Sequence, residues 1–313
     1  MKTLLTITIL LWLGFTSAFS QWISQPSPTS AYLFDVQFVG RQNGWIVGDS
    51  SVFLRTTDAG VTWTKQTLAD FKVLYRVKFL NPFQGWIVGS TKGNRSLILN
   101  TTNGGSSWIV QDSSYSGVYL QSVSFIDSLH GWTVGSAYFP DTLGRIYRTT
   151  NGGKTWVTVA SPKVAWPNDI FFVDTLKGFA VGEYGGIVRT TDGGVTWQEV
   201  YRAYWMNPLG GGGTEPLRKV FFTTRDSGWA IGGISGVETK VRTTDGGVTW
   251  QISNITPNGS SLHGLWFGDS KNGWTVGGGP GGLVIERTTD GGMTWVKQQH
   301  PSDPQALSYF EAV

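Results

Sequence analysis

Short segments of alternating apolar and polar residues follow one another along the chain, and turn-forming residues separate them. Leu33–Phe38 alternates in this way, Gly44–Gly48 follows with the pattern Gly-Trp-x-Val-Gly, and Phe53–Thr57 ends in Arg-Thr-Thr. A fourth short stretch, Thr64–Gln66, comes after a turn that contains Asp and Gly. Alternation with a period of two, enriched in aromatic and β-branched residues, predicts β-strands. The pattern therefore predicts a unit of four short strands.

This four-strand unit recurs along the chain and carries one nearly constant phrase, Thr-Thr-Asp/Asn-x-Gly-x-Thr/Ser-Trp. The phrase occurs six times and ends at Trp63, Trp108, Trp156, Trp197, Trp250 and Trp295. A period of roughly 40–50 residues is typical of repeat architectures, and four short strands make up one propeller blade. The predicted blades span about residues 31–66, 73–111, 118–160, 165–200, 216–252 and 261–298.

The constant phrase has the chemistry of a tight turn. Its Asp or Asn side chain can hydrogen-bond to the backbone two residues further on, and the glycines that follow accept a positive φ. Asn replaces Asp in two repeats, which a turn tolerates and a reaction that needs a carboxylate does not. We therefore assign a structural role to Asp58, Asn103, Asn151, Asp192, Asp245 and Asp290. The Trp that ends each phrase should bury its ring and donate its indole N–H to a nearby carbonyl group.

Both ends of the chain predict parts of a seventh blade. Gln21–Pro26 resembles a fourth strand, and Leu307–Val313 resembles a first strand. Termini that share one blade close a propeller ring and hide its sheet edges. We therefore predict an all-β, seven-bladed propeller of four-stranded antiparallel blades, with six complete blades and an incomplete seventh shared by the N- and C-termini. The two middle strands of that blade are missing, which indicates a chain truncated at its C-terminus and a ring with an unsealed edge.

These repeats resemble the Asp-box, or BNR, repeat of sialidase-like propellers. The combination of Gly-Trp-x-Val-Gly with Arg-Thr-Thr-Asp-Gly-Gly-x-Thr-Trp resembles more narrowly the Ycf48/Hcf136 family, and the resemblance covers residues 21–313. It implies a seven-bladed propeller that contacts other proteins while photosystem II is assembled. Relatives in non-photosynthetic bacteria carry the same repeat on secreted proteins, so the resemblance implies a binding scaffold more firmly than a photosynthetic role.

The first 20 residues have the pattern of a secretory signal peptide. Lys2 precedes the apolar stretch Leu4–Phe15, and Ala18-Phe19-Ser20 has the form of a cleavage site. The stretch is too short to span a membrane and no second one follows. We therefore predict one propeller domain over residues 21–313, exported to the periplasm or the medium, with no transmembrane segment after removal of the signal.

Composition excludes two further possibilities. The absence of cysteine excludes disulfides, and a net charge of +3 without a run of Lys or Arg argues against nucleic-acid binding.

Two of the four connections in each repeat keep their length, and two vary. The first connection always has five residues and the Asp-box turn is constant, whereas the second and fourth connections differ between repeats. Successive connections of a blade alternate between the two faces of the disc, so we expect the binding site on the face opposite the Asp boxes. There, each first strand begins with different residues, and one long loop carries aromatic side chains. The candidate partner-binding residues are Tyr75, Arg76, Asn168, Arg218, His263, Tyr204 and Trp205.

Candidate catalytic residues are sparse. The Arg before Thr-Thr belongs to the repeat, and no paired Glu accompanies it, which argues against a sialidase. Asp35 and Asp169 hold the same position in blades one and four. They could act as acid and base of an inverting glycosidase at a separation of roughly 6.5–9.5 Å, as in xyloglucanase-like propellers. His130, His263 and His300 show no metal-ligand spacing, and we expect neither a metal nor a cofactor. The sequence thus predicts an exported, non-catalytic scaffold for a protein partner, with a glycan-binding or glycoside-hydrolysing propeller as the alternative.

Overall fold

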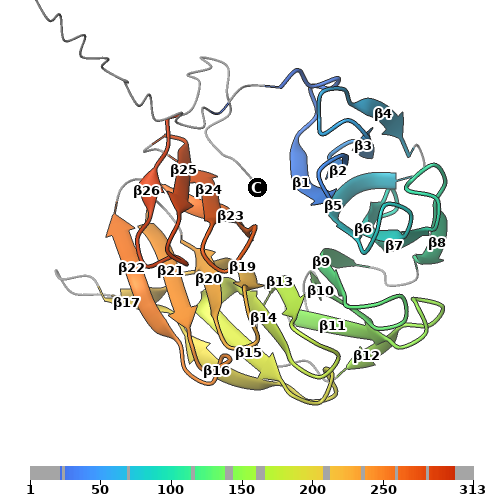
Figure 1. Cartoon of the computed structure of the whole chain (residues 1–313). Helices are drawn as coiled ribbons and strands as arrows, with labels where there is room; N and C mark the ends of the chain where they lie inside the picture. The colour runs from blue at the N-terminus through green and yellow to red at the C-terminus, as the bar shows by residue number, and fades with distance from the viewer. Residues whose placement is uncertain are drawn as a thin grey trace, which may run out of the picture.

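The chain folds as an all-β propeller in the computed structural model, which describes residues 22, 25–68, 71–113, 117–137, 144–159, 166–206, 212–233, 237–257, 260–279 and 282–299. These residues form six four-stranded antiparallel sheets and one two-stranded sheet. Figure 1 shows the sheets arranged as blades around a central axis, with the first strand of each blade nearest the axis. The predicted architecture of four-stranded antiparallel blades is therefore confirmed.

The first three blades follow the chain order of the repeats. Blade 1 contains β1 (Leu33–Val39), β2 (Asn43–Gly48), β3 (Val52–Thr56) and β4 (Thr64–Thr67). Blade 2 contains β5 (Phe71–Phe79), β6 (Gly85–Thr91), β7 (Ser96–Thr101) and β8 (Ile109–Asp112). Blade 3 contains β9 (Val118–Phe125), β10 (Gly131–Ala137), β11 (Gly144–Thr149) and β12 (Val157–Val159).

The last three blades repeat this order, with a hairpin inserted between blades 4 and 5. Blade 4 contains β13 (Pro167–Phe172), β14 (Gly178–Gly182), the 3-10 turn η1 (Glu183–Gly185), β15 (Gly186–Thr190) and β16 (Gln198–Arg202). The hairpin consists of β17 (Tyr204–Met206) and β18 (Gly212–Thr214). Blade 5 contains β19 (Leu217–Phe222), β20 (Gly228–Gly232), β21 (Val237–Thr243) and β22 (Gln251–Pro257). Blade 6 contains β23 (Ser261–Phe267), β24 (Gly273–Gly278), β25 (Val284–Thr288) and β26 (Val296–Lys297).

The first and third connections of each blade lie on one face of the disc, as their constant lengths predicted. The backbone N–H of Ala59 in the first Asp box donates to the Gln42 carbonyl in the first connection, at 3.0 Å. The corresponding bond from Gly104 to Phe83 is 2.7 Å long, and the pattern continues in the other blades. We call this side the Asp-box face. The first strands begin at the opposite end, which we call the mouth face.

Stacked aromatic rings hold neighbouring blades together. The ring of Trp45 in blade 1 stacks on Phe79 of blade 2 with centroids 3.7 Å apart. Trp86 stacks on Phe125 at 3.6 Å in the next pair. The first glycine of Gly-Trp-x-Val-Gly makes room for this Phe, because a Cβ at Gly85 would lie against the ring of Phe79. The motif therefore couples each blade to the next through packed aromatic surface.

The Asp box is a turn held by side-chain hydrogen bonds, as predicted. In blade 1 the Thr56 hydroxyl donates to Asp58 Oδ1 at 2.7 Å, and the Asp58 carboxylate accepts from the backbone and hydroxyl of Thr62 at 2.9 and 2.6 Å. In blade 2 the amide of Asn103 replaces the carboxylate and donates to the Ser107 hydroxyl at 2.8 Å. The turn therefore keeps its geometry whether Asp or Asn is present.

The predicted role of the Asp-box Trp as a hydrogen-bond donor was wrong for most blades. Only Trp197 donates within its own turn, to the Gly194 carbonyl at 3.2 Å, among the described hydrogen bonds. The donor is instead the Trp of Gly-Trp-x-Val-Gly, which reaches the next blade. Trp45 donates to the Gly104 carbonyl at 3.0 Å, and Trp132 donates to the Gly193 carbonyl at 2.9 Å. With the bond from Trp229 to the Gly291 carbonyl at 3.2 Å, they tie blades 1, 3 and 5 to the Asp box of the next blade.

The prediction of seven blades was wrong for the described part of the chain, which has six. Residues 307–313, assigned to an incomplete seventh blade, lie outside the described residues, and Trp22 and residues 25–32 contain no strand. A fourth strand needs the hydrogen-bonded ladder of a third strand, and the described residues contain no such partner for the N-terminal segment. Among the described residues, no ring of another blade stacks on Phe38, which is 42% exposed, whereas its counterpart Phe79 is 2% exposed.

Candidate functional site

Each inner strand carries a β-bulge at the same position, at the mouth face. In β1 the pairing steps from Leu33–Gly48 to Asp35–Val47, so Phe34 has no partner across the ladder. A bulge adds one residue to a strand and changes the direction of its side chain, and bulges are common next to functional sites. The bulge residues of the six blades are Phe34, Tyr75, Gln121, Asn168, Arg218 and His263.

The second glycine of Gly-Trp-x-Val-Gly makes the bulge possible. Gly89 pairs with Leu74, the residue before the bulge residue Tyr75. A Cβ at Gly89 would lie against the carbonyl oxygen of Val73, so no larger residue fits without a shift of the backbone. The same close approach recurs at Gly48, Gly135, Gly232 and Gly277. The repeated glycine therefore explains why residues that differ between blades all occupy equivalent positions.

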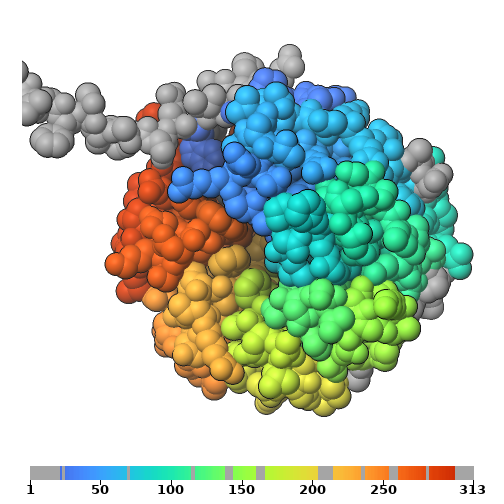
Figure 2. Space-filling view, turned by 45° about the vertical axis from the view of Figure 1, so that its right-hand side comes forward, coloured from blue at the N-terminus to red at the C-terminus, as the bar shows by residue number. Residues whose placement is uncertain are grey.

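The bulge residues surround a small pocket at the mouth of the central channel. The pocket has a volume of about 130 Å³ and is lined by Phe34, Tyr75, Arg76, Gln121, Asn168, Arg218, Lys219 and His263. Five of the seven predicted partner-binding residues are thus brought together, and every blade contributes at least one side chain. Figure 2 shows the blades meeting around the centre of the disc. Tyr204 and Trp205 lie on β17 of the inserted hairpin, and the positions of their side chains are outside the described structure.

An ionic cluster closes the channel directly below this pocket. Arg76 from blade 2 binds Asp35 of blade 1 at 3.0 Å through Nη1 and Asp169 of blade 4 at 3.1 Å through Nη2. Lys219 of blade 5 approaches Asp35 at 4.0 Å, and the Ser122 hydroxyl of blade 3 donates to Asp169 at 2.6 Å. We call these five residues the ionic plug. It joins five blades across the channel axis.

The two carboxylates of the plug also fasten neighbouring inner strands. Asp35 accepts a hydrogen bond from the backbone N–H of Val77 in blade 2, and Asp169 accepts one from Val220 in blade 5, each at 3.0 Å. Both residues are buried, and burial raises the pKa of Asp35 and of Asp169 above the ordinary value for Asp, while Arg76 opposes the shift. A buried carboxylate with these bonds is a structural group, because removal of its partners would leave an unpaired charge.

The structure places Asp35 and Asp169 close together, as an acid–base pair requires, but Arg76 lies between them. The two carboxylates are close enough to share one guanidinium group, as the hypothesis required. However, Arg76 fills the space between them, where an inverting mechanism needs a sugar and a water molecule. In this arrangement the cluster can bind an anion at its upper surface or hold the blades together.

The mouth pocket has an excess of positive charge. Arg76, Arg218 and Lys219 line it, whereas its wall contains no Asp or Glu. Arg76 is engaged with the plug, and Asn168 is held by hydrogen bonds from its amide to Glu183 at 3.1 Å and to the Leu217 carbonyl at 3.0 Å. The arrangement favours an anionic group on a partner, bordered by the rings of Phe34 and Tyr75, whose centroids are 5.8 Å apart.

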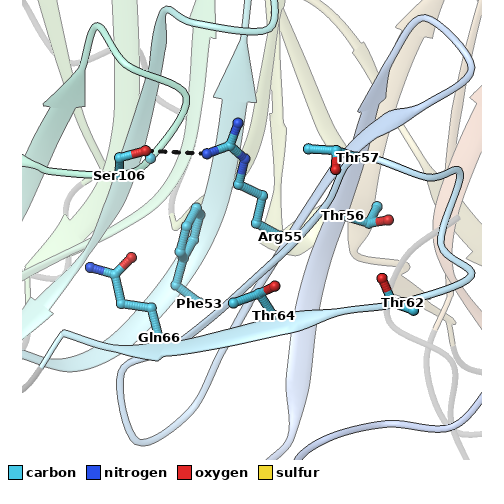
Figure 3. A pocket seen from close by; sticks show the side chains of 9 residues that line it. Phe53, Arg55, Thr56, Thr57, Thr62, Thr64, Gln66 and Ser106 are labelled. Atoms are coloured by element: carbon cyan, nitrogen blue, oxygen red, sulfur yellow. Dashed lines mark hydrogen bonds between the residues drawn. The ribbon is translucent and has the colours of Figure 1, made fainter.

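A larger groove lies between blades 1 and 2 and consists of repeat residues. It has a volume of about 380 Å³, and Figure 3 shows Arg55 above Phe53 with the Asp-box residue Ser106 beside it. Arg55 donates to the Ser106 hydroxyl at 3.2 Å, so the Arg before Thr-Thr joins one blade to the Asp box of the next. This bond supports the structural interpretation of that Arg.

The Asp-box residues themselves lie in separate blades, and no group of three His, Asp or Glu suited to a metal ion occurs among the described residues.

Several residues that line the channel were not predicted from the sequence. Gln37 and Lys78 line the channel below the plug, two positions after the plug residues Asp35 and Arg76, and Trp266 holds the equivalent position in blade 6. Alternation along the strand was the available signal, because residues i and i+2 face the same side. The roles of Ser122 and Lys219 in the plug depend on contacts between distant blades, which no local pattern reports.

Together the fold and the Asp boxes define the chain as an Asp-box β-propeller. Residues 16–165 match the family model described as Photosynthesis system II assembly factor YCF48. The chain is thus similar to Ycf48 propellers, and the resemblance seen in its repeats is confirmed. None of the curated proteins matches the sequence.

Solved structures agree on the fold. A structure titled YCF48 bound to D1 peptide is 22% identical, with a TM-score of 0.61, over 88% of this chain and 87% of that one. YCF48 from Cyanidioschyzon merolae is 20% identical, with a TM-score of 0.63, over 89% and 88% of the two chains. The Niastella koreensis GH74 enzyme is 13% identical, with a TM-score of 0.63, over 85% of this chain and 45% of that one. This chain therefore spans less than half of that enzyme.

Proposed function

We propose that the chain is a non-catalytic propeller scaffold that binds a segment of a protein partner at the mouth pocket. The observation that carries this proposal is the set of six bulge residues, which differ from blade to blade beside motif positions that repeat. Variable side chains on a rigid framework are typical of recognition surfaces. The YCF48 structure with a bound D1 peptide supports a peptide-binding role for a propeller of this kind.

The chemistry of the pocket favours an acidic segment. Arg218 and Lys219 face the pocket beside Arg76, and its wall has no carboxylate. A charge-assisted hydrogen bond between Arg and a carboxylate is about twice as strong as a neutral one. The rings of Phe34 and Tyr75 offer an apolar edge to the same segment. We therefore infer a partner segment with an Asp, a Glu or a terminal carboxylate next to an apolar residue.

The partner should be sought outside the cytoplasm. The N-terminal 20 residues have the pattern of a signal peptide, and we propose export to the periplasm or the medium on that ground. No helix within the described residues has the length and apolarity needed to cross a membrane. The family description names a role in photosystem II assembly. For this chain, only the resemblance to that family supports such a role.

The test is affinity capture with the purified propeller from a periplasmic or secreted fraction. The wild type is compared with Arg218→Ser at the mouth and with Arg225→Ser, whose side chain is exposed in a turn of the Asp-box face. We expect one protein to be captured by the wild type and by Arg225→Ser and to be depleted at least tenfold by Arg218→Ser. Equal capture by all three proteins, or no specific capture, would contradict binding at the mouth.

A glycosidase is the second candidate, because Asp35 and Asp169 share one guanidinium group and GH74 enzymes have a similar fold. The test is hydrolysis of xyloglucan and of an aryl glucoside by the wild type and by Asp35→Asn. The scaffold proposal expects no turnover by either protein. Turnover by the wild type that Asp35→Asn abolishes would replace the scaffold with an enzyme.

A further inference from the structure

A second pocket lies in the channel on the other side of the ionic plug. It has a volume of about 220 Å³, and Asp35, Arg76, Asp169 and Lys219 form one end of it. Its side walls come from residues two positions further along the inner strands, toward the Asp-box face. We call this the lower pocket. The plug separates it from the mouth pocket, so the two pockets open to opposite faces.

Blades 1, 2 and 3 give the lower pocket a polar wall with one unpartnered cation. The side-chain amide of Gln37 already has hydrogen-bond partners. Its Nε2 donates to the Phe79 carbonyl oxygen at 3.0 Å, and its Oε1 accepts from the Phe79 backbone N–H at an N···O distance of 2.5 Å. Ser124 is also engaged, since it accepts from the Phe172 N–H at 3.3 Å. Lys78 lies between them and is partly buried, yet its ammonium makes no hydrogen bond or ion pair with any described residue. Its charge is therefore available to a ligand.

Blades 4, 5 and 6 give the same pocket an aromatic wall. Phe171, Phe221 and Trp266 occupy the positions that hold Gln37, Lys78 and Ser124 in the first three blades. The rings of Phe171 and Phe221 are 5.3 Å apart at their centroids, and Trp266 packs against Trp274 at 5.6 Å. Trp266 remains 45% exposed although it belongs to an inner strand. A large exposed ring at such a position is an apolar surface for a ligand.

The charges around the pocket do not balance. Arg76, Lys78 and Lys219 carry three positive charges, and Asp35 and Asp169 carry two negative charges. The excess is one positive charge. Burial lowers the pKa of Lys78, which means that its ammonium lacks the solvation it would have in water. A single anionic group beside Lys78 would balance the charge and replace the missing solvation.

We propose that the lower pocket binds a small aryl monocarboxylate, with its carboxylate on Lys78 and its ring against Phe171, Phe221 and Trp266. The volume of 220 Å³ equals that of about seven water molecules at ~30 Å³ each. It therefore accommodates one aromatic ring with a short acidic side chain. The proposal is independent of the mouth pocket, because the plug separates the two sites.

The experiment measures binding of 3-phenylpropionate to the purified protein by isothermal titration calorimetry, with 3-phenylpropanamide as the uncharged control. We expect the acid to bind at one site per chain and the amide to bind at least tenfold more weakly, because it lacks the charge that Lys78 pairs with. Quenching of tryptophan fluorescence by the acid, lost in Trp266→Leu, would place the ring against the aromatic wall.

Variants separate a specific site from a general effect of charge. Lys78→Met should weaken binding of the acid at least tenfold, Lys78→Arg should largely retain it, and Lys92→Met, at an exposed position, should leave it unchanged. Thermal unfolding confirms that each variant is folded, and Trp266→Leu serves as an independent test if Lys78→Met does not fold. Equal affinity for acid and amide, the same loss in Lys92→Met, or no binding by the folded wild type would overturn the proposal.

Discussion

Arg76 and Asp169 come from blades 2 and 4 and meet across the channel at 3.1 Å. The same guanidinium binds Asp35 of blade 1 at 3.0 Å. Each carboxylate also accepts a backbone N–H from the blade that follows its own. One side chain thus links blades that the chain order separates, and the inner ends of the blades are held by buried charge as well as by apolar packing.

Removal of the Arg76 charge should destabilise the propeller. In Arg76→Met the two buried carboxylates would lose their common partner, and breaking a buried ion pair in this way costs about 3–5 kcal/mol. The addition of Asp35→Asn should restore part of the loss, because one of the orphaned charges is then removed. The free energy of unfolding, from urea denaturation followed by tryptophan fluorescence, measures both effects.

A surface ion pair provides the matched control for Arg76. Arg225 pairs with Asp174 at 3.3 Å, and its side chain is 72% exposed. Arg225→Met should change the free energy of unfolding by no more than about 1 kcal/mol. If Arg76→Met and Arg225→Met have equal effects, the plug does not hold the blades together.

Much of the fold could be predicted because the sequence pattern of one blade occurs six times along the chain. The Gly-Trp-x-Val-Gly pattern and the Asp box located each blade, and the constant connections identified the shared face. The seventh blade was predicted from segments at the two ends, Gln21–Pro26 and Leu307–Val313, that each resemble one strand. A strand is defined by its hydrogen-bonded partner, and resemblance of an isolated segment does not supply one.

The site could be predicted in part for a related reason. Tyr75, Asn168, Arg218 and His263 were identified as equivalent positions that differ, and they line one pocket in the structure. The ionic plug was not predicted, since Arg76 reaches Asp169 across a sequence separation of 93 residues. The same holds for Lys240 of blade 5, which forms a buried ion pair with Glu286 of blade 6 at 2.7 Å, where other blades have apolar residues. Contacts between blades depend on packing that no repeat pattern contains.

The second glycine of the motif should not tolerate a side chain. Gly89→Ala would place a methyl group against the Val73 carbonyl oxygen, and relief of that clash would displace the bulge at Tyr75. We expect a loss of about 1–3 kcal/mol in the free energy of unfolding. Gly93→Ala is the control, because only the Thr91 hydroxyl lies near its added methyl group, at 3.8 Å. A similar small effect of both substitutions would show that the bulge does not require glycine.

The indole N–H of the inter-blade Trp should contribute measurably to stability. Trp45 donates to the Gly104 carbonyl at 3.0 Å, whereas Trp86 Nε1 has no hydrogen-bond partner among the described residues. Both rings are buried and stack on a Phe of the next blade. Replacement by Phe removes similar apolar area at each site. Trp45→Phe should therefore cost about 1 kcal/mol more than Trp86→Phe in thermal or chemical unfolding, and equal costs would contradict a role for the hydrogen bond.

The Asp boxes should make stability depend on pH in the acid range. Hydrogen bonds from Thr62 lower the pKa of Asp58 to about 2, and those from Thr294 lower the pKa of Asp290 to about 2, compared with an ordinary value of 3.8. Because the folded-state pKa lies below the unfolded one, the stabilisation is fully present above about pH 4 and is lost as the pH falls toward 2. Asn103 and Asn151 form the same turn without a group that titrates. The double variant Asp58→Asn/Asp290→Asn should therefore lose less stability than the wild type between pH 5 and pH 2. Urea denaturation at each pH measures the difference, and parallel curves for the two proteins would show that these carboxylates do not stabilise the fold.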